Sequence, residues 1–130
     1  MTSQLADVAF DREGSIAIAL LSGEVDMSNA TSVRQRISEL VTPDDDAVIL
    51  DLSGLSFIDS AGLHAVFELG AVLDERRQRL LVSVPDGGQV ARTVGIVGMP
   101  RAVSVHRTRD EAVEAAREQV AEARPFPPGD

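Results

Sequence analysis

Residues 47–70 read AVILDLSGLSFIDSAGLHAVFELG, and this stretch decides the fold. Its first part, 47–52, is an almost unbroken apolar run, which is typical of a strand buried on both faces of a sheet. From Ser60 to about Arg77, apolar residues recur at helical spacing. A buried strand that leads directly into a helix indicates an α/β fold, with Asp59 and Ser60 at the carboxyl end of the strand.

The residues on either side of this stretch continue the alternation of strands and helices. Two short apolar segments, 5–10 and 15–21, flank the turn Asp11-Arg12-Glu13-Gly14 and predict a hairpin. A helix with Val33 and Ile37 on its buried face should follow. Periodicity predicts the remaining elements as a strand at 80–84, a helix at 89–97, a strand at 102–106 and a helix at 109–123. This order predicts an α/β domain with a mixed, mostly parallel sheet and flanking helices.

Length and composition indicate one soluble domain. The chain has 130 residues, of which 44% are hydrophobic and 25% charged, so we expect a single domain at 1–123 and a short proline-rich tail at 124–130. The N-terminal residues lack the basic start and the long apolar stretch of a signal peptide. The sequence also has no apolar run long enough to span a membrane. A cytoplasmic protein is the expectation.

Charge and residue usage exclude several kinds of function. The formal net charge of −9 argues against nucleic acid and against an anionic membrane surface as partners. Cysteine is absent, which excludes disulfides, thiolate metal sites and a thiol nucleophile. All 12 basic residues are arginines, so neither a lysine Schiff base nor a P-loop lysine is available. A neutral or basic partner protein fits this composition better.

Asp59 and Ser60 lie at the kind of strand-to-helix corner where open α/β sheets place their sites. The simplest interpretation is structural, because either side chain can cap the helix that begins near Ala61 and stabilise it by about 1 kcal/mol. Capping alone does not explain why an acid and a hydroxyl stand side by side. A phosphoryl group on Ser60 would meet the positive end of the helix dipole and add close to two negative charges beside Asp59. With Asp26 at the same sheet edge, such a modification would act as a switch.

Catalytic and metal-binding interpretations are less well supported by the sequence. A serine nucleophile needs a base within hydrogen-bond reach, and the imidazoles of the chain are His64 and His106. His64 should project with Glu68 on the polar face of its helix. The run Asp44-Asp45-Asp46 is too clustered to surround an ion and is interpreted as a solvated loop. Gly87-Gly88 matches no phosphate-binding spacing and is interpreted as a turn.

The helix that starts at Ser60 has a broad apolar side. Its core face should consist of Leu63, Val66, Phe67, Leu69, Gly70 and Leu73. Ala61, Ala65 and Val72 fall beside this face. They either widen the core stripe or form a shallow apolar strip next to Ser60 that suits a partner protein.

Residues 51–63, DLSGLSFIDSAGL, resemble the signature of the STAS domain, and specifically of bacterial anti-sigma-factor antagonists. Residues 21–26, LSGEVD, resemble a second element of that family, a turn of the Gly-Glu-Leu-Asp type. Residues 94–98, VGIVG, are a weaker match to the end of its third helix. The resemblance covers the chain from about Val8 to Ala123.

The resemblance implies a binding protein and not an enzyme. Members of the family bind an anti-sigma factor that is also a serine kinase, and so free the sigma factor. The kinase phosphorylates the serine after the motif aspartate, which is Ser60 here, and phosphorylation abolishes binding. A metal-dependent serine phosphatase restores it. ATP belongs to the kinase, so the resemblance implies no cofactor and no metal in this chain.

The resemblance also implies that Asp26, Asp59 and Ser60 lie at the partner surface. Together with the start of the helix and the apolar strip, the expected partner-binding residues are Asp26, Asp59, Ser60, Ala61, Gly62, Ala65 and Val72. Many relatives carry a second hydroxyl where this chain has Ala61, which leaves Ser60 as the single acceptor expected at the corner.

Two other functions are compatible with the same sequence. STAS-like domains also serve as binding modules in stress-signalling scaffolds and as small partner subunits of lipid-transport ATPases, without turnover of phosphate. A small hydrolase that uses Ser60 is a third interpretation, and it would need His64 or His106 as its base.

Overall fold

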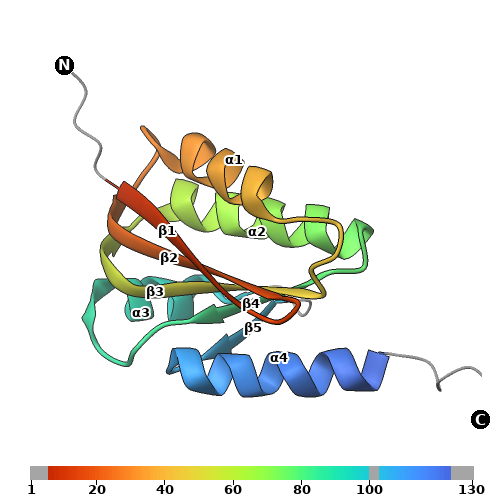
Figure 1. Cartoon of the computed structure of the whole chain (residues 1–130). Coiled ribbons are helices and arrows are strands. Elements are labelled where there is room, and N and C mark those ends of the chain that lie inside the picture. The colour runs from red at the N-terminus through yellow and green to blue at the C-terminus, as the bar shows by residue number, and fades with distance from the viewer. Residues whose placement is uncertain (1–5, 100–102, 124–130) are drawn as a thin grey trace, which may run out of the picture.

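A computed structural model describes residues 6–99 and 103–123, which form one sheet with helices on both faces (Figure 1). In chain order the elements are β1 (Ala6–Glu13), β2 (Ile16–Val25), α1 (Ala30–Leu40), β3 (Ala47–Ile58), α2 (Ser60–Glu75), β4 (Arg79–Ser83), α3 (Gly88–Val97), β5 (Val103–His106) and α4 (Arg109–Ala123). The predicted alternation of strands and helices is confirmed.

The sheet is mixed, as predicted, and its strands follow the order of the chain. The spatial order is β1-β2-β3-β4-β5. The hairpin β1-β2 is antiparallel, whereas β2, β3, β4 and β5 pair with their neighbours in parallel. Parallel strands end at the same edge, so the residues that follow Val25 and Ile58 meet there. This edge carries the residues singled out above.

The central strand β3 is longer than its apolar run suggested. It continues past Leu52 to Ile58, because β2 remains paired with it through register shifts near Ser22 and Glu24. On the other side, β4 pairs with β3 only as far as Asp51 in the described part of the chain. The last residues of β3 before Asp59 are therefore paired with a strand on one side only.

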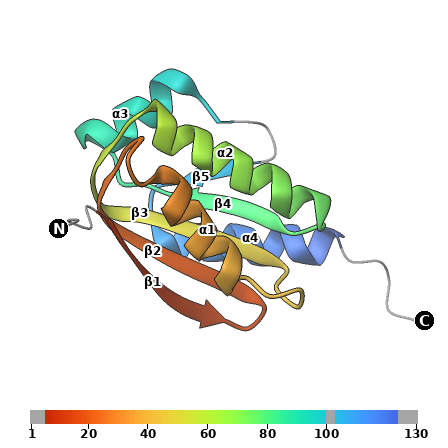
Figure 2. The ribbon, with the colours of Figure 1, turned by 90° about the horizontal axis from the view of Figure 1, so that it is seen from above.

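Two apolar clusters hold the helices to the sheet. Neighbouring residues of a strand face opposite sides, so Val48 and Leu50 belong to a cluster with residues of α1, α2 and α3, whereas Ile49 belongs to a cluster with residues of α4. Seen from above, α1 and α2 cross the sheet side by side, and α3 lies at the end of the sheet where α2 begins (Figure 2). α4 covers the opposite face (Figure 1).

The run of three aspartates is not a solvated loop, because Asp45 is buried. Its side chain is 1% exposed and accepts hydrogen bonds from the Thr42 amide at 2.8 Å, the Thr42 hydroxyl and the Arg12 guanidinium. The Gln78 amide donates to the main-chain oxygens of Thr42 and Asp45, at 2.9 and 2.8 Å. Several donors around one carboxylate offset its loss of hydration. Only the first aspartate of the run, Asp44, is fully exposed.

Candidate functional site

Asp59, and not Ser60, caps helix α2. Its backbone is extended, with φ −108° and ψ −174°, and its Oδ1 accepts a hydrogen bond from the Gly62 amide at 2.9 Å. Ser60 is the first helical residue and its side chain is exposed. Within the described residues, its hydroxyl has no hydrogen-bond partner. The helix start is therefore stabilised without the hydroxyl of Ser60.

The same carboxylate joins α2 to the loop that follows β2. Oδ2 of Asp59 accepts a hydrogen bond from the Met27 amide at 3.2 Å. Asp26, the residue before Met27, thus lies at the same edge of the sheet as Asp59, as predicted. The corner consists of two loop ends held together by one acidic side chain.

Asp26 organises the start of α1. Its Oδ1 accepts hydrogen bonds from the Ser28 hydroxyl at 2.5 Å and from the Ser28 amide at 2.9 Å. These two bonds, the hydroxyl first, lower the pKa of the Asp26 carboxyl because they favour its charged form. Its main-chain oxygen accepts from the amides of Asn29 and Ala30, at 3.1 and 2.8 Å. The exposed hydroxyl of Ser28 is a second hydroxyl on this surface that the sequence did not reveal.

Gly62 allows α2 to begin directly on the strand ends. A Cβ at this position would lie 2.5 Å from Cγ1 of Ile58 and 3.1 Å from the main-chain oxygen of Val25. Such a separation from a side-chain carbon is well inside van der Waals contact. Only a glycine lets the first turn of α2 approach β2 and β3 this closely.

The apolar strip expected beside Ser60 is partly inside the protein. Ala65 is buried at 9% exposure, and both Gly62 and Ala65 line a small cavity between α1 and α2 with a volume of about 20 Å³. For these two positions the strip is part of the core, because α1 packs against that side of α2. Ala61 and Val72 are half-buried, and their contact with a partner stays a prediction.

Two exposed apolar side chains border the corner instead. Met27 is 80% exposed in the loop held by Asp59, and Phe57 is 36% exposed near the end of β3. The sequence signal for both was an apolar residue immediately beside the polar motif. Exposed large side chains that flank a polar centre are typical of a protein-binding surface.

Gln89 of α3 also reaches the corner, although no feature of the sequence predicts it. Its Oε1 accepts from the Ile58 amide at 2.9 Å, and its Nε2 donates to the Ile58 main-chain oxygen at 2.7 Å. Nothing in the sequence links a glutamine in a glycine-rich turn to a residue 31 positions away.

Neither histidine is placed to activate Ser60. The His64 side chain is 72% exposed and its Nε2 lies 3.7 Å from Oε2 of Glu68. Nε2 of His106 is 3.1 Å from the Ser104 hydroxyl. The hydrolase interpretation lacks its base in the described part of the chain.

The described ranges contain neither a metal-binding cluster nor a membrane-spanning helix. Among residues 6–99 and 103–123, no three His, Cys, Asp or Glu side chains gather closely enough to hold a metal ion. None of the helices in these ranges has the length and apolarity needed to cross a membrane.

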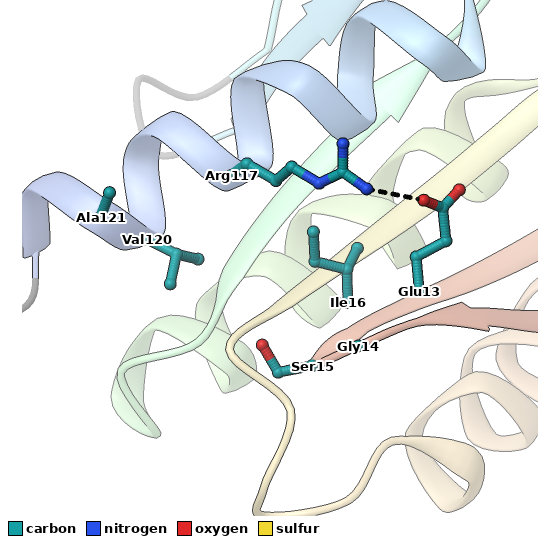
Figure 3. Close-up of a pocket in the computed structure, with 7 residues that line it drawn as sticks. All are labelled: Glu13, Gly14, Ser15, Ile16, Arg117, Val120 and Ala121. Carbon is teal, nitrogen blue, oxygen red and sulfur yellow. Dashed lines mark hydrogen bonds and ion pairs between the residues drawn. The ribbon is translucent and has the colours of Figure 1, made fainter.

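A broad, open depression lies far from this corner. It has a volume of about 570 Å³ and is lined by the β1-β2 turn and the second half of α4 (Figure 3). Its charged groups pair with each other, since Arg117 donates to Glu13 Oε1 at 2.9 Å. The Ser15 hydroxyl donates to Asp46 at 2.6 Å. The depression sits at the opposite end of the strands from Ser60, and its polar groups serve the fold.

Comparison with known proteins identifies similar chains. The anti-sigma-F factor antagonist RsfB of Mycobacterium tuberculosis is 26% identical over 103 residues, which cover 78% of this chain and 82% of RsfB. The crystal structure of an anti-sigma factor antagonist from Mycobacterium paratuberculosis superposes with a TM-score of 0.76 at 24% identity, covering 86% of this chain and 94% of that one.

The fold is also that of SpoIIAA, the Bacillus cell fate determinant. Its phosphorylated form superposes with a TM-score of 0.62 at 20% identity, covering 85% of this chain and 100% of that chain. The profile of the STAS domain family matches residues 7–112, which include the whole corner and most of the sheet and its helices. By that match, and by the five-stranded mixed sheet and four helices of its described residues, the chain belongs to the STAS domain family.

Proposed function

We propose that this protein is an anti-sigma-factor antagonist that binds an anti-sigma factor through the corner around Ser60 and so releases a sigma factor. The main observation behind the proposal is that Asp59 and Ser60 have different functions at the start of α2. Asp59 caps the helix, and the hydroxyl of Ser60 is exposed and unbonded within the described residues. The similarity to RsfB, an anti-sigma-F factor antagonist, supports the same function.

The proposed switch is phosphorylation of Ser60 by the anti-sigma factor acting as a serine kinase. Oγ of Ser60 forms a bond to the γ-phosphorus of ATP, the bond from that phosphorus to the leaving ADP breaks, and the hydroxyl proton passes to a base of the kinase. We assign Asp59 to holding the corner, because its two oxygens accept the main-chain amides of Gly62 and Met27.

Phosphorylation of Ser60 should prevent binding of the anti-sigma factor, because the phosphoryl group adds both negative charge and volume to the surface. The phosphoryl group adds about 1.5 to 2 negative charges at pH 7. It would be attached to the residue next to Asp59, at the sheet edge that also carries Asp26 and the exposed side chain of Met27. A partner surface that fits the exposed hydroxyl would then meet a larger, highly charged and hydrated group. A serine phosphatase that removes the phosphoryl group would restore the binding surface.

The other interpretations are less favoured. RsfB, which resembles this chain in sequence, is an anti-sigma-F factor antagonist, and this favours the antagonist function over a transport subunit. A hydrolase would need a base at Ser60, and among the described residues neither histidine forms a hydrogen bond with it, since His64 lies beside Glu68 and His106 beside Ser104. We therefore propose a binding protein that needs no cofactor of its own and acts in the cytoplasm.

The test is to incubate the purified protein with Mg-ATP and an extract of its own host, and to locate any phosphate by intact mass and peptide fragmentation. We expect one phosphoryl group on Ser60 and none on Ser60→Ala. Fragmentation separates Ser60 from the nearby hydroxyl of Ser28. As a positive control, SpoIIAA is treated in an extract of its Bacillus host. Modified SpoIIAA beside an unmodified sample of this protein would contradict the switch.

Binding to the anti-sigma factor provides a second readout. Ser60→Ala should bind in the presence of Mg-ATP, where the wild-type protein is phosphorylated and released. Ser60→Asp should bind less tightly than wild type, although one charge imitates a phosphoryl group poorly. Equal affinity of wild type and both variants, with and without ATP, would refute the proposal.

A further inference from the structure

We infer that Gln89 is a positioning residue for Ser60, and that it makes phosphorylation of Ser60 depend on helix α3. The inference rests on the proposed function. Its physical basis is the pair of hydrogen bonds between the Gln89 amide and the backbone of Ile58, two residues before Ser60. Gln89 touches neither the acceptor hydroxyl nor any reacting atom, so it acts through the backbone.

The Gln89 side chain takes the place of a missing strand. β4 pairs with β3 only up to Asp51 among the described residues, whereas β2 accompanies β3 to Ile58. The N–H and C=O of Ile58 on the β4 side would otherwise lack a strand partner. A primary amide offers one acceptor and two donors, so it satisfies both groups at once, at 2.9 and 2.7 Å.

The orientation of this amide is fixed by Thr93. Nε2 of Gln89 donates its second hydrogen to the Thr93 hydroxyl at 2.8 Å, and that hydroxyl donates to the Gln89 main-chain oxygen at 2.9 Å. A rotated amide would place NH₂ against the Ile58 amide and oxygen against its carbonyl. The contact therefore has one arrangement and connects the first turn of α3 rigidly to the end of β3.

Ile58 supports the start of α2, where Ser60 lies. Gly62, in the first turn of α2, packs so closely on the Ile58 side chain that a Cβ would approach it to 2.5 Å. The next residue, Asp59, donates its amide to the Val25 oxygen at 3.2 Å and caps α2. Loss of the Gln89 contact would leave Ile58 held from the β2 side alone, and Ser60 would lose its fixed position. Transfer of a group to a misplaced acceptor can be slower by about 10²-fold per ångström.

The chain offers a matched control for this inference. Gln78 also uses its side-chain amide to bond two main-chain groups, the oxygens of Thr42 and Asp45, but at the opposite end of the strands. Gln78→Met and Gln89→Met both remove an amide and keep an unbranched side chain of similar length. The free energy of unfolding should fall to a similar degree in the two variants. A difference between their rates of Ser60 phosphorylation would then come from the place of the lost amide in the fold and not from lost stability.

The experiment measures the initial rate of Ser60 phosphorylation by the host extract with Mg-ATP, at a temperature where circular dichroism shows both variants fully folded. Backbone amide hydrogen exchange is measured by NMR on the same proteins without kinase. We expect Gln89→Met to lower the rate at least 5-fold and to speed exchange at Gly62, whereas Gln78→Met changes neither. Equal slowing in both variants, or unchanged exchange at Gly62 in Gln89→Met, would overturn the inference. A wild-type protein that takes no phosphate contradicts the proposed function, and the exchange data then still decide whether Gln89 positions the corner.

Discussion

Asp26 and Asp59 use their carboxylates in the same way, as acceptors for main-chain amides at the ends of loops. Asp26 binds the Ser28 amide and hydroxyl, and Asp59 binds the amides of Gly62 and Met27. Hydrogen bonds to a charged acceptor are stronger than those to a neutral one. Each acidic side chain therefore has a structural role that is complete before any partner arrives.

The lowered pKa of Asp26 leads to a prediction about pH. A carboxyl with a lowered pKa in the folded state contributes stability at pH values above its unfolded pKa, and the contribution is lost as the pH falls through the folded pKa. Ser28→Ala removes the hydroxyl bond, which is the largest cause of the shift. We expect the pKa of Asp26 in this variant to rise toward its ordinary value, as measured by NMR titration of the side-chain carboxyl carbons.

Asp11 provides the internal control for this titration. The Arg12 amide and the Arg109 guanidinium lower its pKa, and neither contacts Ser28. Its titration should be the same in wild type and Ser28→Ala. An unchanged curve for Asp26 in the variant would show that the hydroxyl does not favour its charged form.

Helix α2 illustrates how packing can override the preference of a residue for helical structure. Alanine normally stabilises a helix relative to glycine by about 0.5 to 1 kcal/mol. At Gly62 the added Cβ would collide with Ile58, and overpacking of this kind costs about 1 to 3 kcal/mol. We expect Gly62→Ala to lower the free energy of unfolding in urea titrations.

The same substitution in α3 should have the opposite effect. Gly95 lies inside α3, and a Cβ there would meet no atom within 4 Å. Gly95→Ala should therefore raise the free energy of unfolding by about 0.5 to 1 kcal/mol. Two destabilised variants, or two stabilised ones, would mean that close packing does not explain the glycine at position 62.

Most elements were predictable because their signals are local. α4 matches its predicted bounds, Arg109–Ala123, since periodic apolar residues define it and Thr108 precedes it. The end of β3 was missed because Ser53 and Gly54 look like a turn. Their pairing with β2 depends on register shifts that only the folded sheet contains.

The site was predictable in part, for the same reason. Asp59 and Ser60 stand in one motif, and Asp26 directly follows the neighbouring strand β2, so topology alone brings them together. Gln89 reaches Ile58 through a side chain from a distant turn, and no periodicity reports such a contact. The prediction that Asp45 is solvated was wrong, because a run of three acidic residues does not indicate that one of them is buried in an ion pair with Arg12.

The two edges of the sheet have different roles in the whole molecule. The edge at the carboxyl ends of the parallel strands carries Ser60 and its exposed neighbours. At the other edge, Asp45 gathers donors from β1 and from the loop after α1, and Gln78 ties the same loop to the start of β4. The contacts of Asp45 and Gln78 and the proposed binding surface therefore lie at opposite ends of the strands.

This separation predicts that stability can be lowered without effect on the switch. Asp45→Ala leaves its buried donors unpaired, and we expect it to lower the free energy of unfolding by about 2 to 4 kcal/mol, since Arg12 is itself partly exposed. Asp44→Ala, one residue away and exposed, should change it by no more than about 0.5 kcal/mol. Thermal or urea unfolding measures both.

Phosphorylation of Ser60 in the folded fraction of Asp45→Ala should proceed at the wild-type rate. The measurement uses a temperature well below the unfolding transition of the variant, so that unfolded chains do not contribute. A slower reaction in fully folded Asp45→Ala would show that the two edges are coupled through the sheet.

The capping of α2 by Asp59 has a consequence for how such proteins can diverge. Because position 60 contributes nothing to the start of the helix, a descendant can replace its serine and inherit the shape unchanged. Under the proposed switch, such a descendant would lose only its response to a serine kinase. If one copy of a duplicated gene changed in this way, that copy would stay active after a single mutational step, and the ancestral copy would remain under the control of the signal.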